Sequence, residues 1–152
     1  MLPRIISINI SKGGIPKLPV SSIVVTASGL EGDGHNHEKH NRPTQAISLQ
    51  DIEKLEELKG EGYVLSPGET GENLTVKDLN VNALSIGSIL EFSSGLVIEI
   101  TKVRNPCYVL DQINPQLKTD IVGRCGMYAQ VNRPGMIKQG DTITLRSAER
   151  NN

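Results

Sequence analysis

Apolar and polar residues alternate over several short stretches of the chain, which is the spacing typical of β-strands. In the first stretch, residues 4–11, Ile6, Ile8 and Ile10 fall on one face. The same pattern predicts further strands at residues 22–26, 45–49, 73–76, 88–92, 96–103, 127–131 and 142–145. Three segments rich in glycine, proline and polar residues are expected to be loops: 12–19, 27–44 and 60–71.

One segment has the longer period of a helix, and we predict a helix over about residues 49–59. Ser48 and Asp51 are suitable starting residues, and the apolar positions recur at helical spacing: Ile52, Leu55 and Leu58. Shorter helical pieces are expected at residues 108–113 and 116–122. Because short strands outnumber helices, the chain is predicted to be mainly β, a closed or partly closed β-barrel with a few short helices.

The composition supports one folded domain over residues 1–152. Isoleucine, leucine and valine number 16, 15 and 11, which is enough for an aliphatic core and too many for a disordered chain. One phenylalanine, three tyrosines and no tryptophan argue against modules that stack nucleic-acid bases on aromatic rings. No apolar run approaches the roughly 20 residues that span a bilayer. The start of the chain lacks the pattern of a signal peptide, so we expect no membrane partner.

The charge is small overall but unevenly distributed. A net charge of −1 excludes the broad basic surface of a nucleic-acid-binding protein. Residues 51–72 carry seven acids and two bases, whereas residues 101–150 carry eight bases and four acids. The basic C-terminal third suits a small anionic ligand. Two cysteines do not make a disulfide framework, so we expect reduced thiols and a cytoplasmic location.

Cys107 is the stronger candidate for a reactive thiol. Asn105 is a good N-cap and Pro106 suits the first helical position, so Cys107 is predicted to be the second residue of a helical turn. Unpaired N–H groups there, together with Arg104, would lower the pKa of the thiol and make it a nucleophile or a soft-metal ligand. The alternative is an inert, half-buried small residue.

Cys125 follows Arg124 but has no capping pattern, and we expect it to be a packing residue. A disulfide with Cys107 is the remaining alternative, and a reducing compartment disfavours it.

All three histidines lie in one loop: His35, His37 and His40. Their spacing resembles part of the metallo-β-lactamase zinc motif, which also needs ligands further along the chain. This chain has no other histidine, and Lys39 stands before the third one. A zinc hydrolase is therefore one alternative. A polar surface loop is another, and ligand binding by His35 together with Asp33 is the third.

Several short motifs follow one another in a specific order along the chain. They are Gly-Leu-Glu-Gly-Asp-Gly-His at 29–35, Arg42 with 45–49, Gly-Glu-Asn-Leu at 71–74, Ile-Gly at 86–87, Arg-Asn-Pro-Cys at 104–107, Gly-Met-Tyr-Ala-Gln-Val at 126–131, Pro-Gly at 134–135, Ile137, and Gly-Asp at 140–141. The set resembles the MOSC domain, named for the C-terminal part of molybdenum cofactor sulfurases, and in particular its short stand-alone bacterial members. The resemblance covers about residues 5–145.

The resemblance implies a β-barrel with a pterin-binding cleft that binds the molybdenum cofactor. It implies sulfur or cofactor transfer, or reduction of N-hydroxylated compounds, and a non-catalytic carrier stays an alternative. The cysteine of the family corresponds to Cys107, which carries a persulfide in some relatives and ligates molybdenum in others. Expected partners are a cysteine desulfurase, a redox partner or a molybdenum enzyme. Pyridoxal phosphate is not expected, because the desulfurase domain is absent.

Residues expected to bind the cofactor combine the motif positions with basic and glycine residues. They are Gly32, Asp33, His35, Arg42, Asn73, Arg104, Arg124 and Gly126. Glycines can offer backbone N–H groups to an anion, and arginines can hold a phosphate with two parallel bonds. We therefore expect an anion site where the glycine loops meet the segment between Arg104 and Arg124.

Overall fold

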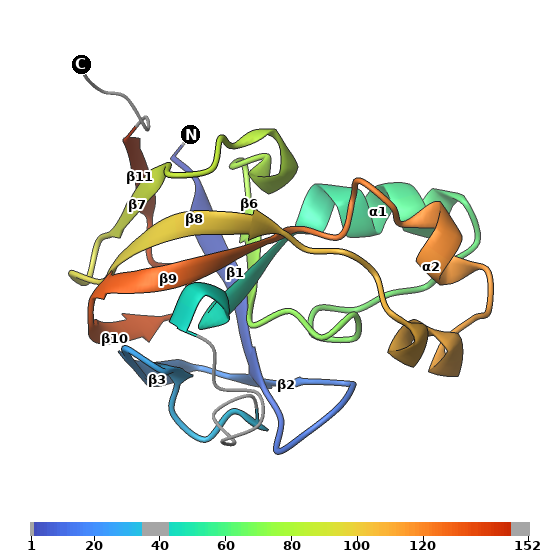
Figure 1. Ribbon diagram of the computed structural model, residues 1–152, viewed down its shortest axis with the longest axis horizontal. Coiled ribbons are helices and arrows are strands. Elements are labelled where there is room, and N and C mark those ends of the chain that lie inside the picture. Colours follow the sequence, from blue (N-terminus) through green and yellow to red (C-terminus); the bar gives the residue numbers. More distant parts are fainter. Residues whose placement is uncertain (1, 35–42, 147–152) are drawn as a thin grey trace.

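Short β-strands around an aliphatic core dominate the computed structural model, which describes residues 2–34 and 43–146 (Figure 1). The large sheet contains β1 (Arg4–Ile10), β2 (Leu18–Val20), β5 (Ile47–Asp51), β6 (Leu74–Lys77), β7 (Ile89–Phe92), β8 (Val97–Val103), β9 (Met127–Arg133) and β11 (Ile143–Arg146). The small sheet contains β3 (Ser22–Thr26), β4 (Gly29–Leu30) and β10 (Gly135–Lys138). The prediction of a mainly β fold with a few short helices is confirmed. Each predicted strand overlaps an observed one, whereas β2, β4 and β10 were not predicted.

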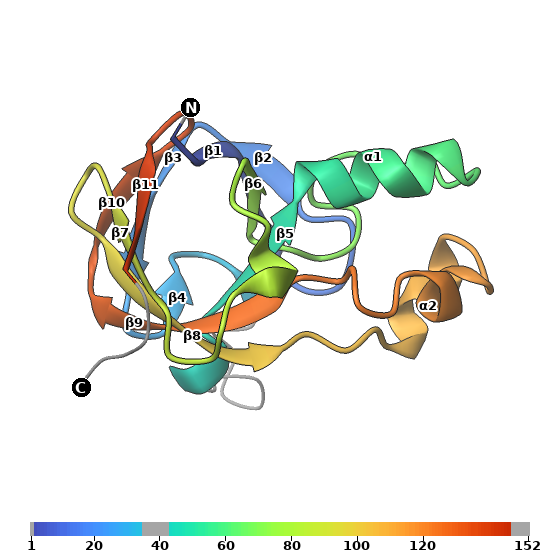
Figure 2. The same ribbon diagram turned by 90° about the horizontal axis from the view of Figure 1, so that it is seen from above.

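The large sheet curls around the core without closing into a continuous barrel. Its strand order is β11-β7-β8-β9-β5-β6-β1-β2, so β11 and β2 are edges. The start of β1 meets the start of β11 at one bridge, between Arg4 and Thr142, and the Ile143 N–H donates to the Pro3 carbonyl at 2.8 Å. Figure 2 shows the strands arranged around the interior. The fold therefore corresponds to the partly closed form of the predicted barrel.

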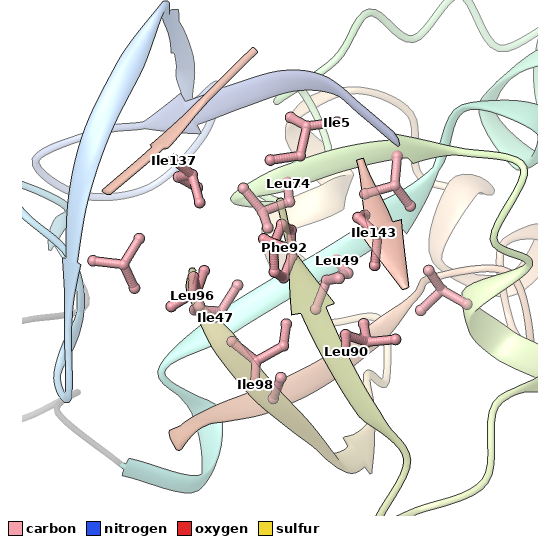
Figure 3. Close-up of a cluster of buried hydrophobic side chains, with 14 of the residues drawn as sticks. Ile5, Ile47, Leu49, Leu74, Leu90, Phe92, Leu96, Ile98, Ile137 and Ile143 are labelled. Carbon is pink, nitrogen blue, oxygen red and sulfur yellow. The ribbon is translucent and has the colours of Figure 1, made fainter. Parts of the chain in front are cut away.

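Isoleucine and leucine side chains from both sheets fill this interior. Ile5, Leu74, Ile98 and Ile143 are among the fully buried ones, and they point toward one another in Figure 3. A core without tryptophan is thus packed by branched aliphatic residues, as the composition predicts.

The first strand differs from prediction in the face that it buries. The sequence alternation places Ile6, Ile8 and Ile10 together, but Ile5 and Ile8 are the buried pair and Ile6 is half-buried. The register of β1 against β6 shifts between Ile5 and Ser7. A bulge of this kind changes which residues face the core, because side chains in a strand alternate.

Two helices lie beside each other at one end of the sheet (Figure 1). The first, α1 (Ile52–Gly60), connects β5 to β6, which pair in parallel, and the second is α2 (Leu117–Asp120). The predicted start of α1 is three residues early, because residues 49–51 complete β5 and Asp51 takes the N-cap position. In the described part, no helix has the length and apolarity needed to cross a bilayer.

A second hydrophobic cluster lies between these helices. Leu55 and Leu58 of α1 pack with Leu117 of α2 and with Leu110 and Cys125. This packing brings the segment after β8 close to the loop that follows α1.

Candidate functional site

A pocket of about 410 Å³ opens where four loops meet beside β5 and β9. Segments 13–17, 33–34, 70–73 and 104–109 contribute lining residues, and Ser48 and Tyr128, which are register partners on β5 and β9, line it as well. Four residues predicted from the sequence meet there: Asp33, Asn73, Arg104 and Cys107. The structure thus brings part of the predicted set of site residues together in one pocket.

Asp33 is a buried carboxylate in the pocket wall. Its Oδ1 accepts the Ser11 backbone N–H at 3.0 Å and lies 2.6 Å from Lys17 Nζ, and its Oδ2 accepts Asn73 Nδ2 at 3.1 Å. The Asn73 Oδ1 accepts the Ser48 N–H at 3.1 Å, which fixes the orientation of the amide. These bonds hold three segments of the pocket wall in one polar network.

Arg104 comes directly after β8 and is positioned by backbone carbonyls. Its Nη1 donates to the Cys125 carbonyl at 3.1 Å, and its Nη2 donates to the Thr70 carbonyl. Burial acts to lower the pKa of the guanidinium, but Cys125, Tyr128 and Glu72 act to raise it, and the net direction is upward. The guanidinium therefore remains charged in the pocket wall.

Cys107 lines the pocket and is exposed. Its backbone is extended (φ −128°, ψ 171°), and it is the N-cap of the 3₁₀ turn Tyr108–Gln112. The predicted position as second residue of a helical turn is therefore wrong. Because the extended residue at the N-cap position is Cys107 and not Asn105, the turn begins two residues later than predicted. Exposure and the nearby Arg104 then remain as the features that favour reactivity.

Cys125 is buried in the second hydrophobic cluster, as expected of a packing residue. Burial raises the pKa of its thiol, and Arg104 opposes this effect. Both cysteines are free thiols in the structure. The two residues therefore differ sharply in access to solvent.

Three predicted binding residues do not line the pocket. The Arg124 guanidinium forms two bonds to the Glu61 carboxylate, at 2.7 and 3.0 Å, so it points to α1 instead. A Cβ at Gly126 would lie 1.8 Å from the Leu49 carbonyl oxygen, so close backbone packing explains this glycine. Gly32 has a positive φ of 80° and belongs to the turn after β4. Of the two arginines predicted to flank an anion site, the structure thus places Arg104 in the pocket wall and Arg124 against Glu61.

The predictions for the histidine loop concern residues outside the described part of the chain. His35, His37, His40 and Arg42 lie outside the described residues. Within residues 2–34 and 43–146, no group of three or more histidine, cysteine, aspartate or glutamate residues is arranged to hold a metal ion.

Sequence reasoning missed several residues of the site. Ser48 and Tyr128 were detectable because both belong to segments of the family resemblance, 45–49 and 126–131, whereas Lys17 lies in a loop without a distinctive pattern. Glu72 is fully buried and accepts the Gly68 N–H at 3.0 Å and the Thr70 hydroxyl at 2.6 Å. Only the folded structure shows that this carboxylate organises the turn at 68–71.

The family model of the MOSC domain matches residues 33–144, which is more than half of the 152-residue chain. The chain belongs to the MOSC domain family. In this MOSC protein the match runs from Asp33 to the second residue of β11 and includes three of the four pocket-wall segments, whereas the segment 13–17 precedes it.

Two relatives in sequence are longer than this MOSC protein. A protein of Gibberella moniliformis named Reductase is 27% identical over 131 residues, which are 81% of this chain and 23% of the relative. The YflK protein of Bacillus subtilis is 29% identical over 143 residues, which are 88% of this chain and 63% of YflK. The chain thus spans less than a quarter of the first relative and less than two thirds of the second.

Solved structures share the whole fold. The YuaD protein of Bacillus subtilis superposes with a TM-score of 0.82 at 22% identity, covering 98% of both chains. YiiM of Geobacillus stearothermophilus gives a TM-score of 0.79 at 25% identity, covering 95% of this chain and 75% of YiiM. At 22% identity, the likeness to YuaD shows that the two proteins share a fold and says nothing about a shared activity.

Proposed function

We propose that this MOSC protein binds the molybdenum cofactor in the pocket beside β5 and β9, with Cys107 as the residue that carries the chemistry. The observation that supports the proposal is the placement of an exposed thiol in the same pocket as the charged Arg104 and the buried Asp33–Asn73 network.

The pocket fits the chemistry of this cofactor in size and in donor set. A volume of about 410 Å³ lies within the range of roughly 300–1,000 Å³ common for small-ligand sites. A cysteine thiolate is a soft ligand of the kind that suits a thiophilic metal such as molybdenum. A guanidinium has five N–H donors, and the two carbonyl bonds of Arg104 leave others for the phosphate of a pterin.

Each residue of the site has a distinct role in this proposal. When bound, the molybdenum supplies two-electron redox chemistry and exchange of sulfur or oxygen. Cys107 holds the metal or carries a sulfur atom, and Arg104 binds the anionic end of the cofactor. The buried amide of Asn73 donates to the Asn9 carbonyl and to Asp33 and accepts the Ser48 N–H, so its role is to hold the pocket wall in place. We infer a cytoplasmic location, because a reducing compartment keeps an exposed thiol free.

The relative named Reductase favours an enzymatic role. The resemblance to the family suggests the reaction, the reduction of N-hydroxylated compounds with the molybdenum cofactor. Such an enzyme needs an electron donor and a small substrate. The alternative is a carrier that takes sulfur from a cysteine desulfurase and passes sulfur or cofactor to a molybdenum enzyme, without turnover of its own. The exposure of Cys107 is compatible with both roles.

The decisive experiment measures molybdenum and pterin in protein purified from a molybdenum-replete host. We expect molybdenum by elemental analysis and pterin fluorescence in the wild type, loss of the metal in Cys107→Ser, and retention in Arg124→Lys as a matched control. Wild-type protein without either component, or full retention in Cys107→Ser, would contradict the proposal. Turnover of an N-hydroxylated substrate with a chemical reductant identifies the enzyme, and one added sulfur atom on Cys107 by mass spectrometry identifies the carrier.

A further inference from the structure

Gly71 lies in the pocket wall, between the guanidinium of Arg104 and the side chain of Ile15. A Cβ at this position would be 3.1 Å from Arg104 Nη2 and 3.2 Å from Ile15 Cγ2. Both contacts are closer than a carbon atom normally approaches its neighbours. The backbone of Gly71 also has a φ of 91°, which L-residues with a side chain rarely adopt. Any side chain here would press on the guanidinium.

The turn that contains Gly71 cannot move back to make room. The Gly71 N–H donates to the Gly68 carbonyl at 3.1 Å, and the buried Glu72 carboxylate accepts the Gly68 N–H and the Thr70 hydroxyl. The Thr70 carbonyl, one residue before Gly71, accepts Arg104 Nη2. The same turn therefore both binds the guanidinium and leaves the space that the guanidinium needs.

We propose that Gly71 is a positioning residue for Arg104. By lacking a side chain, it lets the guanidinium lie against the turn at 68–71, where its remaining N–H groups face an anionic group of a ligand near Cys107. The identity of that ligand rests on the proposed function, whereas the positioning of Arg104 does not.

Alkylation of Cys107 tests this role without any cofactor. Iodoacetate is anionic and iodoacetamide is neutral, so the ratio of their rates reports the positive potential at the thiol. The rates are measured by mass spectrometry of the peptide that carries Cys107. Arg104→Gln, which removes the charge, is expected to lower the ratio by about threefold or more. Gly71→Ala is expected to lower it toward the same value.

A double-variant cycle separates this role from a general structural effect. If Gly71 acts through Arg104, Gly71→Ala changes the ratio little when Arg104→Gln is already present. Gly62→Ala is the matched control, because Gly62 has a φ of 105° and nothing within 4 Å of the added Cβ. It carries similar backbone strain and should leave the ratio unchanged. Should Gly71→Ala not fold, Gly71→Asn adds a Cβ with the residue that best tolerates positive φ.

Three results would overturn the proposal: an unchanged ratio in a folded Gly71 variant, an unchanged ratio in Arg104→Gln, or effects of the two substitutions that simply add. The proposed function is tested by a separate measurement, the molybdenum and pterin content of the wild-type protein. A protein found to contain neither would contradict the proposed function, but the alkylation ratios would not change. A lowered ratio in the Gly71 variants would then still establish the positioning role.

Discussion

The ammonium group of Lys17 lies 2.6 Å from the carboxylate of Asp33, and both side chains are shielded, with 12% and 0% of their surface exposed. Lys17 precedes β2 and Asp33 follows β4, so a single ion pair joins two walls of the pocket. Removing one partner of a buried ion pair leaves the other charge unpaired away from water, which is costly.

Asp33→Asn is therefore expected to lower the free energy of unfolding by about 2–4 kcal/mol. Urea denaturation measures this change. Lys118→Gln is the control, because Lys118 and Asp111 pair at 3.2 Å with 44% and 43% of their side chains exposed. We expect that substitution to cost less than about 1 kcal/mol. Equal losses in the two variants would show that the Lys17–Asp33 pair is not specially stabilising.

Arg104→Lys is expected to weaken binding of a pterin phosphate by about tenfold or more, because lysine cannot reproduce the two-pronged geometry of a guanidinium. Arg124→Lys should change that affinity by less than about twofold, since the Arg124 side chain binds Glu61 outside the pocket. Fluorescence titration of both variants measures the affinities. A tenfold loss in both variants would instead support an anion site formed by the two arginines together.

Cys107 is expected to react with iodoacetamide at neutral pH at least about tenfold faster than Cys125, because only Cys107 is exposed and burial raises the pKa of the Cys125 thiol. Peptide mass spectrometry after short labelling distinguishes the two. In concentrated urea the two thiols should react at similar rates, which serves as the control. Faster labelling of Cys125 in the native protein would reverse the assignment of the reactive cysteine.

Asp141 should make stability depend on pH on the acid side. Burial acts to raise the pKa of its carboxyl, but bonds from the Ser94 hydroxyl at 2.6 Å and the Lys138 N–H at 3.0 Å, together with the Lys138 charge, lower it overall. The folded state therefore binds this proton less readily than the unfolded chain. The resulting stabilisation is complete above the ordinary pKa of 3.8 and is lost as the pH falls through the lower native value.

Asp141→Asn removes this contribution. The difference in unfolding free energy between wild type and variant should thus shrink as the pH is lowered from about 6 to about 2. Urea unfolding at several pH values measures it. A difference that stays constant, or grows toward acid pH, would contradict the lowered pKa.

Strands could be predicted from the sequence where apolar and polar residues alternate because one face of the strand is buried in the core. Residues 22–26 were predicted and Ser22–Thr26 is observed as β3. The edge strand β2 was missed because Pro19 and the exposed Leu18 break the pattern, and an edge tolerates a proline that an inner strand does not. The start of α1 was placed three residues early because Ser48 also looks like a starting residue, whereas β5 continues to Asp51, which takes the N-cap position. The Asp51 carboxylate itself accepts the distant Val81 N–H.

The site was predictable where local chemistry or the ordered motifs of the family identify a residue. Cys107 and Arg104 belong to one motif and do meet in the pocket. Arg124 was misplaced because its partner, Glu61, is 63 residues away, and local sequence gives no direction for a long side chain. Lys17 was missed for the same reason, since its role depends on Asp33 in a separate loop.

The walls of the pocket come from four segments separated by long stretches of chain: 13–17, 33–34, 70–73 and 104–109. A small molecule seated among them acts as a noncovalent cross-link between distant parts of the sequence. Opening of any one of these segments then loses contacts with the bound molecule, so binding and local stability are coupled. Protein carrying its ligand should outlast the empty form under proteolysis, and the supply of that ligand would set how much of the protein persists in a cell.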